Sequence, residues 1–214
     1  MAAAGTCSLS GCYARSGRSR SEVGGEAMKD IFRGELVRLA VESPETLAKS
    51  QTRWYRDSEL TRLADPEPAQ LWSEKKHKEW TEKQMEKDGD NNFRFSIRTL
   101  SDDKLIGEVS IHPQWVDADA WVGIGLGERD YWGRGYGTDA MRLILQYGFI
   151  ELNLQRVSLA LHSYNERALK SYEKVGFKVE GTLRQDTLRE GRRTDGIFMG
   201  ILRDEWLAMQ GDKA

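Results

Sequence analysis

Three glycines alternate in a short loop, and their type and spacing suit the binding of an anion. Gly133, Gly135 and Gly137 follow an apolar run and open a segment whose apolar residues recur at helical spacing from Met141 to Leu152. The start of such a helix presents unpaired N–H groups and a positive dipole end, and glycine lets an anion approach the backbone closely. The loop therefore predicts a phosphate site, although a plain turn that starts a helix explains the spacing equally well.

Familiar nucleotide motifs do not account for this loop. A Walker loop requires G-x-x-x-x-G-K-[ST], and no lysine precedes Thr138. The dinucleotide fingerprint, with its G-x-G-x-x-G spacing and a later acidic residue, also fits poorly. The spacing thus disfavours a nucleoside triphosphate and leaves the ligand open.

A second stretch that could do chemistry begins at Asn165. Asn165, Ala168, Tyr172 and Gly176 recur at i, i+3, i+7 and i+11, which places them on one face of a helix. An amide and a phenol on either side of a small alanine suggest a narrow slot that passes over Ala168. A structural alternative stays open, in which Asn165 caps the helix and Tyr172 packs with its hydroxyl outward.

The elements that would position these residues alternate between helices and strands. Hydrophobic periodicity and turn residues predict strands at 36–41, 93–100, 104–112, 120–126, 156–162, 177–188 and 195–202, and helices at 44–55, 57–63, 69–87, 138–152, 165–175 and 203–209. Ser43 and Pro44 mark the start of one helix, and Gly176 marks the end of another. With no internal repeat, the order predicts one mixed α/β domain at residues 28–210.

Composition restricts the class of protein. The chain has 214 residues and a net charge of −2, which gives no general attraction to nucleic acid or to an anionic membrane. No apolar run reaches the roughly 18 residues of a transmembrane helix. Residues 1–27 are rich in Ala, Ser, Gly and Arg and are predicted to be a disordered tail. Both cysteines, Cys7 and Cys12, lie in it, so the body has neither a disulfide nor a thiol nucleophile.

The three histidines show no metal-ligand spacing, and no metal is predicted. His77 lies on a highly charged helix, where we expect it to be solvated. His162 ends a predicted strand close to the helix that carries Tyr172.

Together, YWGRGYGTDAMRLILQYGF and NERALKSYEKVGF resemble the GNAT superfamily of acyl-CoA-dependent N-acetyltransferases. The chain looks most like the branch that holds the RimJ/RimL ribosomal-protein acetyltransferases and the spermidine N-acetyltransferases. The resemblance covers nearly all of residues 33–206 and includes RGELVRLA, IGEVSIHP and VEGTLRQ. It implies a single GNAT-type α/β (α+β) domain: a mixed, mostly antiparallel twisted sheet with a splayed central strand pair and flanking helices.

The resemblance also implies acetyl-CoA as the co-substrate. The family's acyl-CoA loop, [QR]-x-x-G-x-[GA], is matched at Gly135 and Gly137, whereas Trp132 departs from its first position. The pyrophosphate would lie on residues 134–138, and the pantetheine would lie between strands 120–126 and 156–162. The implied donor-binding residues are Gly125, Leu126, Gly127, Trp132, Gly133, Arg134, Gly135, Tyr136, Gly137, Thr138, Asn165, Ala168 and Tyr172.

Family membership would make Tyr172 the general acid and Asn165 a contact to CoA. A neutral amine would attack the thioester carbonyl, a backbone N–H would stabilise the oxyanion, and Tyr172 would protonate the departing thiolate. The general base stays open between Glu108 and Asp186, which are candidates by type and could equally be exposed carboxylates.

The leading hypothesis is therefore a cytoplasmic acetyl-CoA-dependent N-acetyltransferase that acts on a primary amine: a protein N-terminus, a polyamine or another small amine. The alternative is a catalytically silent acyl-CoA-binding regulatory or interaction module of the same fold. Tyr172 and Asn165 favour the enzyme, because a binding module does not need the phenol. We expect no nucleic acid or membrane partner, and a homodimer is compatible with the family. The acceptor would contact residues 43–87 and 184–196, which do not identify it.

Overall fold

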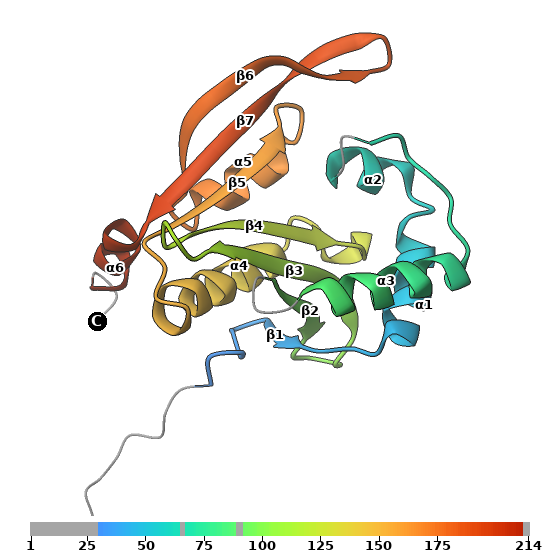
Figure 1. The fold of residues 1–214 in the computed structure, drawn as a ribbon, viewed down its shortest axis with the longest axis horizontal. Coiled ribbons are helices and arrows are strands. Elements are labelled where there is room, and N and C mark those ends of the chain that lie inside the picture. The colour runs from blue at the N-terminus through green and yellow to red at the C-terminus, as the bar shows by residue number, and fades with distance from the viewer. Residues whose placement is uncertain (1–29, 65–66, 89–91, 212–214) are drawn as a thin grey trace, which may run out of the picture.

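A computed structural model describes residues 30–64, 67–88 and 92–211 of the chain (Figure 1). The prediction for the tail at 1–27, including its two cysteines, lies outside the described residues. Within the described ranges, no helix has the length and apolar character needed to cross a membrane.

A seven-stranded sheet runs through the molecule in the order β1-β2-β3-β4-β5-β7-β6. All neighbouring strands are antiparallel except β4 and β5, so the predicted mixed, mostly antiparallel sheet is confirmed. The strands are β1 (Val37–Ala40), β2 (Phe93–Thr99), β3 (Leu105–Gln114), β4 (Asp119–Leu126), β5 (Arg156–His162), β6 (Lys178–Arg189) and β7 (Arg192–Leu202).

The parallel pair β4 and β5 splays apart, as predicted. The two strands pair only from Asp119↔Arg156 to Trp121↔Ser158 and then diverge (Figure 1). The second half of β4, which contains Gly123 and Gly125, therefore has no strand beside it on the β5 side. Because backbone N–H and C=O groups require partners, this half of β4 offers a row of polar groups to whatever enters the opening.

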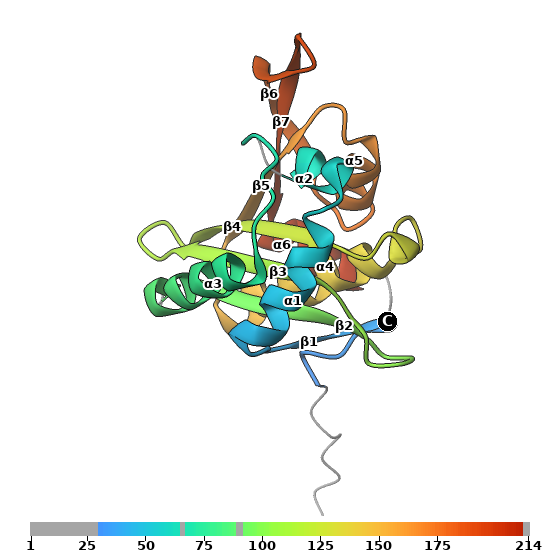
Figure 2. The same ribbon diagram turned by 90° about the vertical axis from the view of Figure 1, so that its right-hand side faces the viewer.

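The helices are α1 (Pro44–Trp54), α2 (Ser58–Ala64), α3 (Glu74–Asp88), the 3-10 turn η2 (Arg129–Tyr131), α4 (Tyr136–Gln146), the π-helical turn η3 (Tyr147–Glu151), α5 (Glu166–Glu173) and α6 (Arg203–Gly211). α1 and α3 lie side by side (Figure 2), and α4 packs against β1, β3 and β4. Several predicted boundaries were wrong, and two of them are helix starts. α3 starts at Glu74 and leaves Leu71 exposed before it, and α4 starts two residues early because Gly135 in the left-handed region acts as its N-cap.

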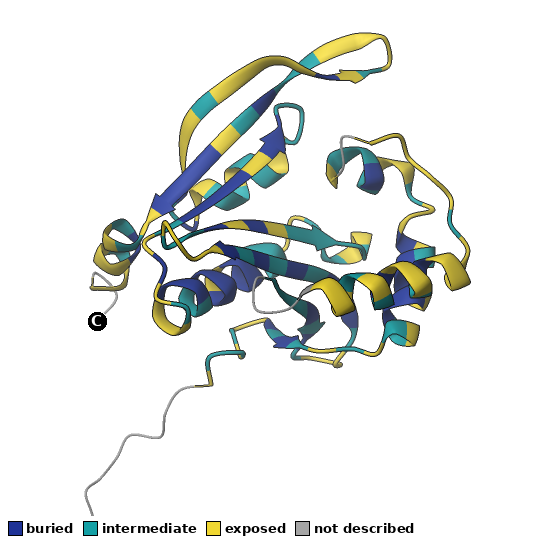
Figure 3. Cartoon of the chain, in the orientation of Figure 1, coloured by how far each residue is buried: buried dark blue, intermediate teal, exposed yellow. Residues whose placement is uncertain are grey.

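The core lies between the strands and α4 (Figure 3). The predicted apolar face of this helix is buried: Met141, Ile144 and Leu145 are each at most 1% exposed. Gly148 continues that face, and a Cβ there would lie 2.9 Å from Ile111 Cδ1. Burial of this face therefore fixes how the glycine loop before α4 is presented to the sheet.

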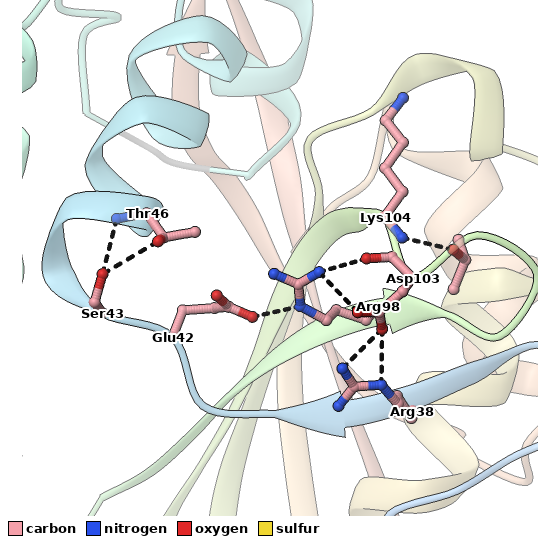
Figure 4. A network of polar contacts seen from close by, with 8 residues as sticks. Arg38, Glu42, Ser43, Thr46, Arg98, Asp103 and Lys104 are labelled. Atoms are coloured by element: carbon pink, nitrogen blue, oxygen red, sulfur yellow. Dashed lines mark hydrogen bonds and ion pairs between the residues drawn. The ribbon is translucent and has the colours of Figure 1, made fainter.

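An ion-pair network joins the start of α1 to the β2–β3 turn (Figure 4). Arg98 pairs with both Glu42 and Asp103, and Asp103 also accepts from Arg38 at 2.7 Å. Ser43 accepts a hydrogen bond from the Thr46 N–H at 3.2 Å, which confirms the predicted helix start. Such partly exposed pairs contribute about 0–1 kcal/mol each, so the network orients α1 more than it stabilises the fold.

The prediction that His77 is solvated was wrong. His77 is only 5% exposed, and its ring lies 5.4 Å from that of Tyr55 and 5.3 Å from that of Trp72. The cause is the packing of α3 on α1, which buries a residue between charged sequence neighbours. Nε2 has no hydrogen-bond partner among the described residues, and burial lowers the pKa of the imidazole.

Candidate active site

A cavity of about 770 Å³ fills the opening between β4 and β5. Its walls come from the free half of β4, the end of β5, the glycine loop and one face of α5. The structure thus brings together two sequence stretches that are more than 25 residues apart. The predicted donor-binding residues that line it are Gly125, Leu126, Trp132, Gly133, Gly135, Gly137, Thr138, Asn165, Ala168 and Tyr172.

Three predicted donor-binding residues do not line this cavity. Gly127 lies beside Trp54, and a Cβ there would come within 2.0 Å of the indole, so packing explains this glycine. Arg134 donates to the Asp130 carbonyl at 3.1 Å. The Tyr136 ring packs edge-on against a neighbouring tyrosine, with ring centroids 4.9 Å apart. Any role of the last two in the loop would therefore come from their backbone N–H groups.

The glycine loop has the geometry of an anion site. Gly133 and Gly135 have φ of 70° and 92°, a region that favours glycine. The first hydrogen bond inside α4 runs from Asp139 N to Gly135 O, so the preceding amides point out of the helix end. At Gly137 an added Cβ would lie 3.4 Å from Leu126 Cδ1, an ordinary contact. No neighbour among the described residues requires glycine there, so the backbone at this position stays open to close approach by a ligand.

Trp132, the departure from the family motif, holds the loop to β4. Its indole N–H donates to the Leu126 carbonyl at 2.7 Å. Two guanidinium groups make cation–π contacts with this ring: Arg167 lies 3.8 Å and Arg129 4.9 Å from its centroid. Arg167 lines the cavity, and burial lowers its pKa. Sequence reasoning missed Arg167, because a cation–π contact between separate elements has no signal in residue spacing.

The residues on one face of α5 contribute both to the capping and packing of the helix and to the wall of the cavity. Asn165 caps the helix by accepting from the Ala168 N–H at 3.2 Å, and it also lines the cavity. Tyr172 lines the cavity and packs against Phe177 with ring centroids 6.0 Å apart. Burial raises the pKa of Tyr172 to about 12, so the phenol stays protonated at neutral pH.

A second cavity of about 210 Å³ adjoins the first on the other side of β4. The two share Gly123, Ile124 and Gly125, and the smaller one is also walled by the aromatic residues Trp54, Tyr55 and Trp80. Glu108 lines the smaller cavity and accepts a hydrogen bond from Gln51 Nε2 at 2.8 Å. Burial raises the pKa of its carboxyl group.

Asp186 of β6 and His162 of β5 also line the larger cavity. The β6–β7 register shifts here, and Gln185, with φ of 55°, turns the chain. Gly196 leaves room for the carboxylate, since a Cβ there would lie 2.9 Å from Asp186 Oδ2. Thr187 Oγ1 lies 3.3 Å from that oxygen and 3.2 Å from His162 Nδ1. The two candidate bases thus differ in environment: Glu108 is partly buried and Asp186 is exposed.

Across the described residues, no group of three or more His, Cys, Asp or Glu is arranged to hold a metal ion. The groups that line the two cavities include backbone amides, the protonated phenol of Tyr172 and the carboxylates of Glu108 and Asp186.

The sequence profile described as "Acetyltransferase (GNAT) domain" matches residues 37–178. The SPbeta prophage-derived uncharacterized N-acetyltransferase YokL of Bacillus subtilis (strain 168) is 33% identical over 134 residues, which cover 60% of this chain and 71% of that protein. Spermidine N(1)-acetyltransferase of Escherichia coli (strain K12) is 38% identical over 79 residues, which cover 37% of this chain and 42% of that protein.

Solved structures agree with this fold. Spermidine N-acetyltransferase from Vibrio cholerae, in complex with CoA and spermine, aligns with a TM-score of 0.69. The alignment covers 80% of this chain and 98% of that chain at 23% sequence identity, so it bears on the fold alone.

Proposed function

Because the chain belongs to the GNAT family of N-acetyltransferases, we propose that it transfers the acetyl group of acetyl-CoA directly to a primary amine. One observation carries this proposal: two cavities meet at Gly123–Gly125, with Tyr172 in the wall of the larger and Glu108 in the wall of the smaller. A donor in the first and an acceptor in the second would bring the thioester and the amine together over β4.

In the donor cavity, the N–H groups at the start of α4 would hold the pyrophosphate, and Arg167 would add positive charge. The pantetheine would pair with the backbone of β4 that β5 leaves free. A β4 N–H would then stabilise the oxyanion that forms at the thioester carbonyl. The fold itself would position these groups, so they would need little reorganisation during the reaction.

In the transfer step, the amine nitrogen attacks the thioester carbonyl carbon, the C–N bond forms and the C–S bond breaks. Glu108 takes the proton from nitrogen, directly or through water, and Tyr172 gives its proton to the departing sulfur. The burial that raises the pKa of Tyr172 would also raise the pKa of a thiol leaving beside it. Orienting both reactants can contribute on the order of 7–11 kcal/mol.

Glu108 is the better candidate base for two reasons. It lines the cavity that the acceptor would occupy, and burial moves its pKa up toward the operating pH, where a general base is most effective. Asp186 is exposed, and its carboxylate accepts a hydrogen bond from the Thr187 hydroxyl at 3.3 Å. Its position suits a contact to the more distant part of an acceptor.

The acceptor belongs to the class of primary amines: a protein N-terminus, a polyamine or another small amine. Two relatives are named as spermidine acetyltransferases, but one matches over less than half of its length and the other shares only the fold. Among the described residues, the smaller cavity has aromatic walls, one carboxylate, Glu108, and one guanidinium group, Arg94, a combination that would suit a single amine on an apolar body.

Release of the CoA thiol from acetyl-CoA, measured over a panel of polyamines, aminoglycosides, amino acids and short peptides, tests this function. We expect amine-dependent thiol release with at least one member of the panel. CoA binding by calorimetry with no amine-dependent release would favour the silent acyl-CoA-binding module. ATP serves as the control ligand, because the loop lacks the lysine of a triphosphate site.

A further inference from the structure

The short helix α2 covers the junction of the two cavities. Leu60 and Ala64 line both, Leu63 lines the larger, and Thr61 lines the smaller. Figures 1 and 2 show α2 across the open end of the V formed by β4 and β5. The position of α2 therefore decides whether the proposed acceptor cavity has its complete wall.

The N-terminus of α2 is held from the donor side. Asp57 Oδ1 caps the helix by accepting from the N–H groups of Glu59 at 3.0 Å and Leu60 at 3.4 Å. Arg129 Nη2 lies 2.7 Å from the same oxygen and 2.6 Å from Glu59 Oε2. Hydrogen bonding to Arg129 lowers the pKa of Asp57. Arg129 also stacks on Trp132 of the donor loop.

The C-terminus of α2 is held by the loop between β5 and α5. Tyr164 OH donates to the Arg62 carbonyl at 2.5 Å, and Asn165 Nδ2 donates to the Leu63 carbonyl at 3.4 Å. These carbonyls belong to the last turn of the helix, which has no intrahelical donors for them. Asn165 lines the donor cavity itself. Both ends of α2 are thus completed by residues that contact the donor site.

A helix of this length is unstable alone, because nucleation is unfavourable and few intrahelical bonds follow it. α2 therefore depends on these partners at its two ends. We propose that Arg129 and Tyr164 are positioning residues, which transmit occupation of the donor site to α2 and so complete the acceptor cavity. This inference rests on the proposed function. By thermodynamic linkage, a donor that stabilises α2 raises the affinity for an acceptor that contacts it.

Amide hydrogen exchange of the full chain, with CoA as the probe, tests the coupling without knowledge of the acceptor. CoA should slow exchange in residues 58–64 of the wild type by about fivefold or more, the equivalent of one stabilising hydrogen bond of about average strength. Arg129→Gln and Tyr164→Phe should each reduce this protection to less than about twofold. Lys178→Gln removes a comparable ion pair, with Glu205, far from α2 and should behave as the wild type.

Asp57→Asn tests the ion pair with Arg129 separately from the N-cap of α2. Asparagine keeps the N-cap oxygen, so α2 should stay helical, while the loss of charge weakens the contact to Arg129 and lowers the protection by CoA. If CoA still protects α2 from exchange in Arg129→Gln, Tyr164→Phe and Asp57→Asn alike, that result would overturn the inference. So would equal exchange of α2 with and without CoA in a wild type that binds CoA by calorimetry, a result that leaves the proposed function intact. Absence of CoA binding would instead overturn both.

Discussion

Glu108 lies directly opposite Gly125 in the antiparallel pairing of β3 and β4, and Gly125 lines both cavities. An added Cβ on Gly125 would meet no atom within 4 Å, so packing does not explain this glycine. A carboxylate therefore lies beside a bare stretch of backbone at the place where the two cavities meet. In the proposed mechanism, the amine would therefore lose its proton beside this pair of β-strands.

Glu108→Gln should lower kcat and change its pH dependence. The base acts only when ionised, and burial raises its pKa, so wild-type kcat at saturating acceptor should fall as pH falls through that raised value. Glutamine cannot accept the proton but still can accept the bond from Gln51. We expect kcat of the variant to be roughly 10²-fold lower. We also expect the acid limb, which is the fall of kcat toward low pH, to disappear. Thiol release measured between pH 5 and 9 checks both.

Asp186→Asn is the matched control for this change. The side chain is exposed, so its loss should leave the acid limb in place and alter mainly KM for the acceptor. An acid limb that survives in Glu108→Gln and vanishes in Asp186→Asn would reverse the assignment of the base.

Glu108→Gln should also stabilise the fold at high pH. Because the folded-state pKa is raised, the folded protein holds this proton more tightly than the unfolded chain does. The free energy of unfolding is therefore greatest below the ordinary glutamate pKa and falls as pH rises through the folded value. We expect Tm of the variant to exceed that of the wild type by about 2–4 °C at pH 8, the equivalent of about 1 kcal/mol, with no difference at pH 4. A lower Tm at pH 8 would contradict a desolvated carboxylate.

Gly137→Ala should separate folding from donor binding. The site lies in the first turn of α4 and has room for a methyl group, so alanine should raise stability by up to about 1 kcal/mol. The same methyl group would obstruct the pyrophosphate and raise KM for acetyl-CoA by roughly tenfold, a loss of about 1.4 kcal/mol. Gly135→Ala offers the contrast, since its φ of 92° makes alanine destabilising. A higher Tm with unchanged KM would remove Gly137 from the donor site.

His77→Leu should reduce the amount by which the free energy of unfolding falls on acidification. Burial lowers the folded-state pKa of His77 below its ordinary value, so the unfolded chain binds the proton more readily. The wild-type free energy of unfolding therefore falls as pH drops below the ordinary histidine pKa of about 6.5. In urea unfolding, the free energy of unfolding of the variant minus that of the wild type should be about 1 kcal/mol greater at pH 5 than at pH 8. An equal gain at both pH values would mean that His77 is not protonated on unfolding.

Much of the fold could be predicted from the sequence, because its signals are local. The period of the apolar residues from Met141 onward identifies α4, and Ser43 identifies the start of α1. The charged neighbours of His77 hid its burial, since the packing of α3 on α1 involves residues far apart in the chain. The stacking of Arg167 on Trp132 and the tethers of α2 have the same origin. Long-range contacts of this kind leave no periodicity to read.

The site was predictable to a similar extent. The spacing of Asn165, Ala168 and Tyr172 does place all three on the wall of one cavity. Residue type could not separate Glu108 from Asp186, because burial, which raises the pKa of Glu108, is a property of the folded chain. The family resemblance placed Gly127 among the donor-binding residues, whereas in the structure it packs against Trp54, where an added Cβ would clash with the indole.

Single turnover of enzyme-bound acetyl-CoA by Tyr172→Phe, with the best amine acceptor, tests the central claim most directly. The variant keeps the ring and its packing on Phe177 but cannot protonate the departing thiolate. We predict a rate of thiol release at least tenfold below that of the wild type, within the roughly 10²–10⁴-fold range of acid–base catalysis, with CoA affinity nearly unchanged. A wild-type rate in the variant would contradict proton donation by Tyr172 and the reaction centre built around it.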